Sequence, residues 1–401
     1  MNLIVTSLLV ILLLIFFIII GIDLFLHFRS VFYRIHIGRW TKQEDWLQQI
    51  NRVTVEWLKK TPTVKITDNE RYVFLDLLKR KYKSSSIQSW QEGGLVLGSS
   101  TYSKNNQGSH NTNIDTFISN KIDNATGKWK TIPPHVDGVI LAYAMAKHVS
   151  DTKKIEPALH ETIALIENNR GEDGTIFYRD FIPDIRFVDT IGFICPFLTF
   201  YGVNFNEPKY IDLAFHQIEE YKKKAFLESI NIPAHAFDIK QNAPLGIYGW
   251  GRGLGWFILG LVDMYNELPK DHERKDFLKE LIIKTADDTL QFQRENGSFG
   301  AMLFVKGFRH DSSITTLAGW LFLNAFKISG NPTYLSAAEK CIASLMKVTR
   351  RNGVIDFCQG DTKGIGDYAK TFDLMPFVQG LTVRLVVDFN SVIKKQDNKG
   401  D

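Results

Sequence analysis

The sequence predicts an all-α protein, an (α/α)6 toroid preceded by one N-terminal transmembrane helix. An uncharged apolar run, Leu3 to Ile22, opens the chain. After it, apolar residues recur at helical spacing in segment after segment, and extended runs are short. Similar Asn-Gly joints then recur between paired helices, at 169–176, 296–299 and 352–355. An internal period of about 50 to 60 residues is typical of helical hairpins that bury their faces by stacking on their neighbours.

The apolar run is long enough to cross a membrane. Leu3 to Ile22 is 20 residues, and at about 1.5 Å per residue it spans the roughly 30 Å hydrocarbon core. No basic segment precedes it and no small-x-small cleavage site follows, which favours an uncleaved anchor over a signal peptide. The flank 27–42 carries Arg29, Arg34, Arg39 and Lys42. The positive-inside rule therefore predicts that the body of the protein faces the cytoplasm.

These signals divide the chain into four parts. They are a transmembrane anchor (1–26), a basic juxtamembrane segment (27–42), the barrel (43–393) and a polar tail (394–401). Within the barrel the sequence predicts helices over 41–60, 69–82, 134–148, 155–168, 186–201, 208–224, 246–265, 273–293, 312–329, 332–349 and 368–392. Ser99 to Ile132 is polar and poorly periodic, so we expect a long loop or lid there. About six hairpins can close into a ring, and an open solenoid is the alternative.

Composition excludes several classes of function. The net charge of +4, from 48 basic and 44 acidic residues without a clustered basic stripe, does not indicate a nucleic-acid partner. Cys195, Cys341 and Cys358 are far apart and lie among apolar residues, so they predict buried thiols rather than disulfides or a zinc site.

Two aspartates stand at equivalent places in the repeat. Asp137 and Asp189 are 52 residues apart, each at the start of a predicted inner helix. Two carboxyl groups that face one cleft can divide the roles of proton donor and electrostatic partner, because burial and mutual repulsion raise one pKa. The alternative is structural: Asp137 caps its helix, and Asp189 pairs with Arg186.

Other polar and aromatic groups start the remaining inner helices. In GWGRGLGW, Trp250 and Trp256 flank Arg252, and the glycines leave the backbone open to a ligand. Arg252 could bind a carboxylate and the indoles could stack on a sugar ring, although tight helix packing is the alternative. The other candidates for binding are His235, Asp311 and Ser312.

The motifs RFVDTIGFICPFL, HAFD, GWGRGLGW and DSSITT, in this order and spacing, resemble glycoside hydrolase families 88 and 105. These are the unsaturated glucuronyl and rhamnogalacturonyl hydrolases. The resemblance covers about residues 43–390 and implies an (α/α)6 barrel. It also implies oligosaccharide substrates whose non-reducing end is a 4,5-unsaturated uronic acid.

The chemistry implied by this resemblance is hydration of the C4=C5 vinyl ether. Asp189 would protonate C4 and then activate the water that adds at C5, and Asp137 matches the second aspartate of the family. His235, Trp250, Arg252 and Trp256 would bind the unsaturated sugar. The resemblance implies no metal, and no cofactor is expected.

Two positions differ from the family pattern. Gly138 follows the second aspartate in a segment where Ser or Asn is usual, and Leu254 stands where an amide is expected. The predicted anchor is also unusual for these mostly soluble enzymes. Two alternatives therefore stay open: a sugar-binding or inactive module in membrane-associated polysaccharide assembly, and a conventional inverting glycosidase. The aglycone, the linkage and the oligomeric state are left open by the sequence.

Overall fold

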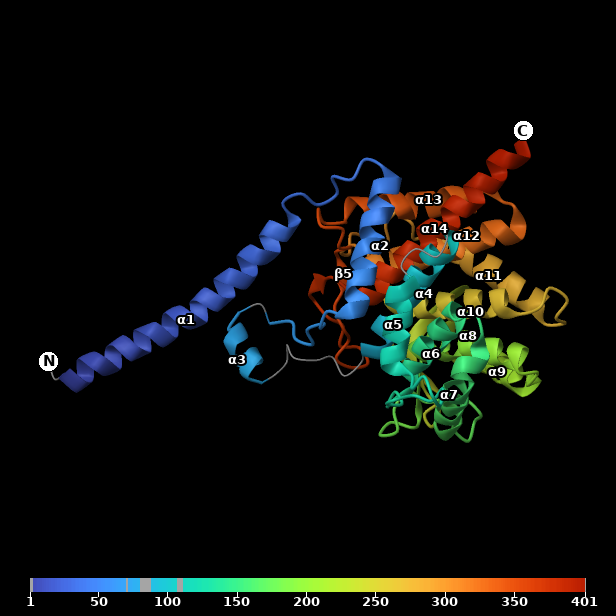
Figure 1. Cartoon of the computed structure of the whole chain (residues 1–401), viewed down its shortest axis with the longest axis horizontal. Coiled ribbons are helices and arrows are strands. Elements are labelled where there is room, and N and C mark those ends of the chain that lie inside the picture. Colours follow the sequence, from blue (N-terminus) through green and yellow to red (C-terminus); the bar gives the residue numbers. More distant parts are fainter. Residues whose placement is uncertain (1–2, 70, 80–87, 107–110, 401) are drawn as a thin grey trace.

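The computed structural model describes residues 3–69, 71–79, 88–106 and 111–400. In this part of the chain, six inner helices form a ring and six outer helices surround them. The N-terminal helix extends away from this body (Figure 1). The inner helices are α4 (Gln88–Asn105), α6 (Val139–His148), α8 (Val188–Asn204), α10 (Gly251–Glu267), α12 (Ser312–Ser329) and α14 (Pro376–Gly400). The outer helices are α2 (Gln43–Lys59), α5 (Asn111–Lys121), α7 (Glu156–Asn168), α9 (Pro208–Ala225), α11 (Lys275–Leu290) and α13 (Pro332–Lys347).

The ring is closed. Each inner helix packs on the next, and α14 packs on α4. Glycines permit this last contact, because a Cβ atom on Gly98 would overlap the backbone of Gly380. The predicted (α/α)6 toroid is confirmed, and the open solenoid is excluded.

The repeated joints share one turn. Gly174, Gly297 and Gly353 have φ values of 75°, 82° and 87°, in the left-handed region that favours glycine. The sequence indicates one further, diverged joint between Gly174 and Gly297. The structure has a small antiparallel sheet there, which carries the chain from α9 to α10.

In this sheet the central strand is β3 (Ile230–Asp238), which pairs with β1 (Ile185–Phe187), β2 (Phe226–Leu227) and β4 (Ala243–Tyr248). Phe187 lies opposite Ala236, so the strand that leads into α8 is aligned beside His235. Two shorter strands, β5 (Cys358–Gln359) and β6 (Phe372–Asp373), pair with each other before α14. The short helices η1 (Val136–Gly138) and η2 (Thr152–Ile155) complete the described elements.

The prediction of a long loop or lid over Ser99–Ile132 is wrong. Its described part contains the end of α4 and all of α5. The polar residues that weaken the helical pattern are accommodated because their side chains bond to carbonyls four residues earlier. Ser99 donates to Leu95 O at 2.8 Å and Thr101 to Leu97 O at 2.8 Å.

Other boundaries also shift. The helix expected over 69–82 is reduced to α3 (Val73–Leu78) in the residues described. The helix expected from residue 246 begins only at α10, because residues 243–248 extend β3 as β4. The helix expected over 368–392 is displaced to α14, which includes most of the predicted polar tail.

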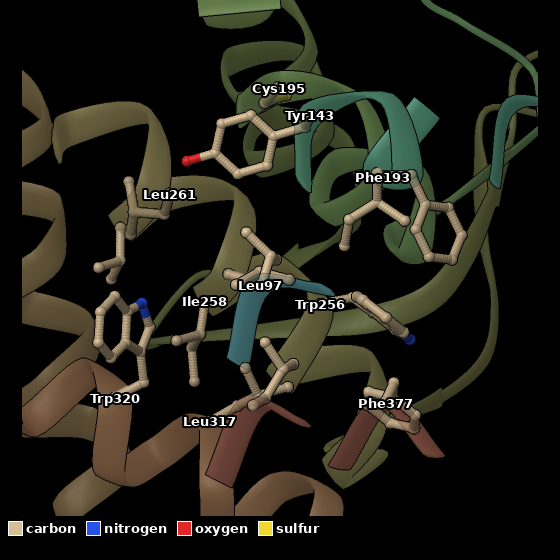
Figure 2. Packing of buried hydrophobic residues seen from close by; sticks show 14 of the residues in the cluster. Leu97, Tyr143, Phe193, Cys195, Trp256, Ile258, Leu261, Leu317, Trp320 and Phe377 are labelled. Carbon is tan, nitrogen blue, oxygen red and sulfur yellow. The ribbon is translucent and has the colours of Figure 1, made fainter. Parts of the chain in front are cut away.

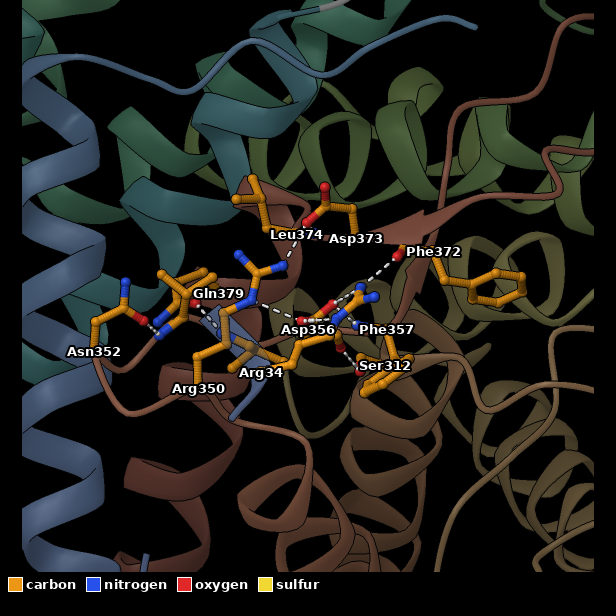
Figure 3. A network of polar contacts seen from close by, with 12 residues as sticks. Arg34, Ser312, Arg350, Asn352, Asp356, Phe357, Phe372, Asp373, Leu374 and Gln379 are labelled. Carbon is orange, nitrogen blue, oxygen red and sulfur yellow. Dashed lines mark hydrogen bonds and ion pairs between the residues drawn. The ribbon is translucent and has the colours of Figure 1, made fainter. Parts of the chain in front are cut away.

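The N-terminal helix α1 (Leu3–Arg34) extends through the predicted anchor into the predicted juxtamembrane segment. It is long and apolar enough to cross a membrane, and none of its most apolar stretch is buried in the protein. Its last turn is joined to the barrel by Asp356. This fully buried carboxylate accepts two hydrogen bonds from Arg34, both at 2.8 Å, and one from Arg350 at 2.7 Å (Figure 3).

The core fills the ring with large aromatic and aliphatic side chains (Figure 2). The Trp256 ring stacks on Phe377 at 5.1 Å between centroids and lies 4.6 Å from Phe193. The packing is close, because a Cβ atom on Gly192 would lie 2.6 Å from the Trp256 carbonyl oxygen. The three cysteines are buried and unpaired, as predicted.

Candidate active site

Asp189 lies in the first turn of α8, directly after β1. Phe187 is the N-cap residue and no side chain caps this helix. The Oδ2 atom of Asp189 is buried without a hydrogen-bond partner. Arg186 instead pairs with Asp173 at 2.7 Å, so the structural alternative for Asp189 is wrong.

Burial determines the ionisation of Asp189. It raises the pKa of this carboxyl to about 7, while the charge of Arg252 opposes the shift. A carboxyl of this kind is partly protonated at neutral pH and can donate a proton.

His235 lies beside Asp189 on β3. Its Nε2 atom is 3.9 Å from Asp189 Oδ2, and its Nδ1 atom has no hydrogen-bond partner. Burial lowers the pKa of His235 to about 3, and the charge of Arg252 adds to this effect. The imidazole is therefore neutral, so it does not stabilise an ionised Asp189 as a cation would.

Asp137 lies in η1, at the start of the preceding inner helix. Its Oδ2 atom accepts hydrogen bonds from Arg179 at 3.2 Å and from the Tyr178 hydroxyl at 3.3 Å. The Arg179 guanidinium stacks over the Tyr178 ring at 3.8 Å. Burial raises the pKa of Asp137, and Arg179 opposes that shift. Asp137 therefore has partners, whereas the buried oxygen of Asp189 has none.

Arg252 binds the backbone of residues 359–360, which follow the Asn-Gly joint at Gly353. Its two Nη atoms donate to the carbonyl oxygens of Gln359 and, at 3.0 Å, of Gly360. The next residue, Asp361, has a carboxylate oxygen 4.0 Å from Arg252 Nη2. Burial raises the pKa of Asp361, and the charge of Arg252 lowers it. Because Arg252 is 2% exposed, it acts through this segment and through its field rather than as an open fork for a ligand.

Trp250 and Tyr368 flank the imidazole. The His235 ring centroid lies 4.4 Å from the Trp250 ring and 5.4 Å from the Tyr368 ring. Trp250 is itself held by a hydrogen bond from its Nε1 to Gln359 Oε1 at 3.0 Å. The aromatic groups therefore fix the orientation of His235.

All six predicted binding residues expose 3% of their surface or less. His235, Trp250 and Arg252 nevertheless lie beside Asp189, whereas the other three belong to the core or to a helix cap. Trp256 is 1% exposed and belongs to the core. Asp311 is fully buried, and its Oδ1 atom caps α12 by accepting from Ser313 N at 2.9 Å. The buried Ser312 hydroxyl donates to the carbonyl oxygen of Asp356. These contacts correct the expectation that Trp256, Asp311 and Ser312 face the substrate.

The two departures from the family pattern have packing explanations. A side chain at Gly138 would overlap the Pro133 ring. Leu254 is fully buried in the core. Neither position presents a polar group to the site.

Sequence reasoning missed Tyr178, Arg179, Asp361 and Tyr368. All four belong to joints between an outer and an inner helix rather than to helix starts. A signal was available, because each follows an Asn-Gly joint that leads toward the same end of the ring.

A closed ring of inner helices surrounded by outer helices is the (α/α)6 fold shared with solved glycoside hydrolases of families 88 and 105. The chain belongs to Glycosyl Hydrolase Family 88, whose family model matches residues 50–386.

Two curated proteins are similar over part of their length. The unsaturated 3S-rhamnoglycuronyl hydrolase of Formosa agariphila is 23% identical over 233 residues, which are 52% of this chain and 58% of that protein. The protein of the same name from Alteromonas sp. (strain LOR) is 28% identical over 101 residues, 24% of each. This chain therefore spans only about half, or less, of these relatives.

Solved structures share the fold over most of the chain. A family 105 glycoside hydrolase of C. acetobutylicum is 16% identical with a TM-score of 0.65, covering 80% of this chain and 98% of that one. The unsaturated glucuronyl hydrolase of Bacillus sp. GL1 is 15% identical with a TM-score of 0.60, covering 86% and 94%. At these identities the similarity establishes the fold alone.

Proposed function

We propose that this protein hydrolyses oligosaccharides whose non-reducing end is a 4,5-unsaturated uronic acid. The observation that carries the proposal is Asp189, whose Oδ2 atom is buried without a hydrogen-bond partner and whose pKa is raised to about 7. An ionised carboxylate with this oxygen buried would need a partner, because an unpaired buried charge is costly. A proton donor needs to retain its proton near neutral pH.

The proposed reaction begins with proton transfer from the Asp189 carboxyl to C4 of the C4=C5 double bond. Positive charge develops at C5 and on the ring oxygen. Water adds to C5 and returns a proton to the Asp189 carboxylate. The resulting hemiketal opens, and the hemiacetal left at C1 expels the aglycone. Asp189 is restored to its protonated form, and one water is consumed.

The neighbouring groups support these steps in different ways. Arg252 lowers the pKa of Asp189, which limits how firmly the proton is held. His235 is neutral, so it adds no positive charge beside Asp189 that would hold the carboxyl in its ionised form. We propose that Asp137, supported by Arg179, stabilises the positive charge at C5.

The direct test is loss of the ultraviolet absorbance of the conjugated double bond. The substrate panel should include oligosaccharides of the rhamnoglycuronyl and glucuronyl types named for the similar proteins, each with its saturated counterpart. Consumption of only the unsaturated members supports the proposal. Consumption of the saturated members would instead indicate a conventional glycosidase, and binding without any turnover would indicate a sugar-binding module.

We also propose that α1 is an uncleaved anchor and that the barrel faces the cytoplasm. The helix continues unbroken beyond its apolar run to Arg34, whose side chain pairs with the buried Asp356. A cleavable signal peptide requires an accessible cleavage site after its apolar region. Resistance to alkaline extraction tests the anchor, and protease protection in intact cells tests the side of the membrane.

A further inference from the structure

A cavity of about 230 Å³ lies where α1 meets the barrel. Its walls come from the last turns of α1, from Lys65, Asn69 and Val73, from Arg309 and from the β6 region. Its basic lining residues are His27, Arg29, Arg34, Lys65, Arg309 and Arg350, and its one acidic lining residue among those described is Asp373. We call this cavity the junction pocket.

Part of the positive charge of the junction pocket is not balanced by the protein. Arg350 pairs with Asp356 and with Asp373, and Arg34 shares Asp356 (Figure 3). In the described part of the chain, by contrast, no ion pair involves the lining residues Arg29, Lys65 or Arg309. The guanidinium of Arg309 instead lies 4.7 Å from the Phe372 ring. The pocket thus carries three cationic groups ready to receive an anion.

The depth of the pocket along α1 indicates where this anion would come from. The apolar run ends at Ile22, and Arg29 follows seven residues later. At about 1.5 Å per residue, Arg29 lies roughly 10 Å beyond the end of the run. The headgroup layer of a bilayer begins at the edge of the hydrocarbon core and is several ångströms thick. Leu26 and Tyr33 add apolar surface to the same lining.

The helix α3 provides a second apolar surface beside α1 (Figure 1). Asp23 on α1 accepts hydrogen bonds from Tyr72 N at 2.6 Å and from Val73 N at 2.9 Å, which holds α3 close to the end of the apolar run. Leu75 and Leu78 are 52% and 64% exposed, although a soluble surface would favour polar residues there. An apolar helix face at this depth fits the interface between headgroups and acyl chains.

We propose that the junction pocket binds the phosphate-bearing headgroup of an anionic phospholipid, while α3 rests in the interface beside it. This inference rests on the proposed anchoring of α1. The phosphate would be held by Arg29, Lys65 and Arg309, and the acyl chains would lie along α1 and α3. The bound lipid would restrict the tilt of the barrel on the membrane.

The test uses the full chain reconstituted in nanodiscs of phosphatidylcholine with phosphatidylglycerol, with retained lipid counted by native mass spectrometry. The test variant combines Arg29→Gln, Lys65→Gln and Arg309→Gln. The control combines Lys153→Gln, Lys279→Gln and Lys340→Gln, three exposed residues elsewhere on the barrel. We expect the control to retain phosphatidylglycerol like the wild type, and the test variant to lose affinity by about fivefold for each charge removed.

The outcomes separate the pocket from the anchor. If all three proteins enter the nanodiscs and retain phosphatidylglycerol equally, the pocket proposal is wrong and the anchor stands. If the wild type does not enter the bilayer at all, both are wrong. A soluble acidic oligosaccharide and glycerol phosphate are competitors in the same assay. If the oligosaccharide displaces the lipid and binds more tightly, the pocket is a carbohydrate site instead.

Discussion

Asp356 is fully buried and Asp189 has one buried carboxyl oxygen, yet the two side chains have opposite surroundings. Asp356 accepts hydrogen bonds from Arg34 and Arg350, and these contacts outweigh the effect of burial and hold its pKa below the ordinary value. Asp189 has a buried oxygen without a partner, and burial raises its pKa to about 7. Of these two aspartates, the one that joins α1 to the barrel is charged and paired, whereas the candidate proton donor keeps one carboxyl oxygen without a partner.

The largest expected effect is on turnover by Asp189→Asn. An amide cannot donate a proton to C4, so we expect kcat to fall by about 10² to 10⁴. Initial rates of absorbance loss on the preferred unsaturated oligosaccharide measure this change. Calorimetric titration should show that the variant still binds the substrate. Near-normal turnover by a folded Asp189→Asn variant would contradict the assigned role.

The second prediction concerns stability and Asp356→Asn. This change leaves the buried Arg350 and the partly buried Arg34 without their shared carboxylate. Breaking a buried pair by removing one partner typically costs roughly 3 to 5 kcal/mol. Denaturant unfolding of the full chain in detergent measures the loss. The matched control is Asp373→Asn, which removes a half-exposed carboxylate that pairs with Arg350 and should cost about 1 kcal/mol or less. Equal losses in the two variants would contradict the comparison.

The third prediction separates the two aspartates by pH. The pKa of Asp189 is higher in the folded chain than in the unfolded one, so the folded state binds more protons between about pH 4 and pH 7. The contribution of Asp189 to the free energy of unfolding therefore falls as pH rises through this window, by at most roughly 1.4 kcal/mol per unit.

The free energy of unfolding of the wild type should therefore fall relative to that of Asp189→Asn as pH rises. Above neutral pH the variant should be the more stable of the two proteins. Asp356, whose pKa is lowered, has the opposite sign: its contribution is present above about pH 4 and is lost as pH falls further. Unfolding titrations at several pH values measure both. A wild type and an Asp189→Asn variant with parallel stability profiles would mean that Asp189 is not protonated in the folded protein.

A smaller effect is expected from Asp361→Asn. The charge of Asp361 raises the pKa of Asp189, so its removal should move the alkaline limb of kcat/KM to lower pH. The pH profile of the variant measures this shift. A shift to higher pH would contradict the arrangement of charges around Asp189.

The smallest effect is expected from Arg52→Ala. Its side chain pairs with Glu56 across one turn of α2, and both side chains are more than half exposed. Such pairs contribute about 0.5 kcal/mol or less. The variant therefore serves as a baseline for both the activity and the unfolding measurements.

Much of the fold could be predicted from the sequence because helical hairpins are local. The period of apolar residues predicted most helices, and the recurring Asn-Gly joints predicted the repeat. Polar stretches whose side chains bond to their own helix backbone, such as Ser99 and Thr101, were misassigned because their pattern is that of a loop. Strand β3 was missed because its partners, β1 and β4, are recognised only by pairing.

The candidate site, too, could be predicted only in part from the sequence. The sequence by itself determined that Asp137 and Asp189 stand one repeat apart at the starts of inner helices. Only the tertiary structure decided which of them lacks a partner, because pairing depends on Arg179 and Arg186, whose contacts are not encoded by spacing. Burial, likewise, is a property of the closed ring. It places Trp256 in the core and raises the pKa of Asp189, which a linear pattern of residue types could not reveal.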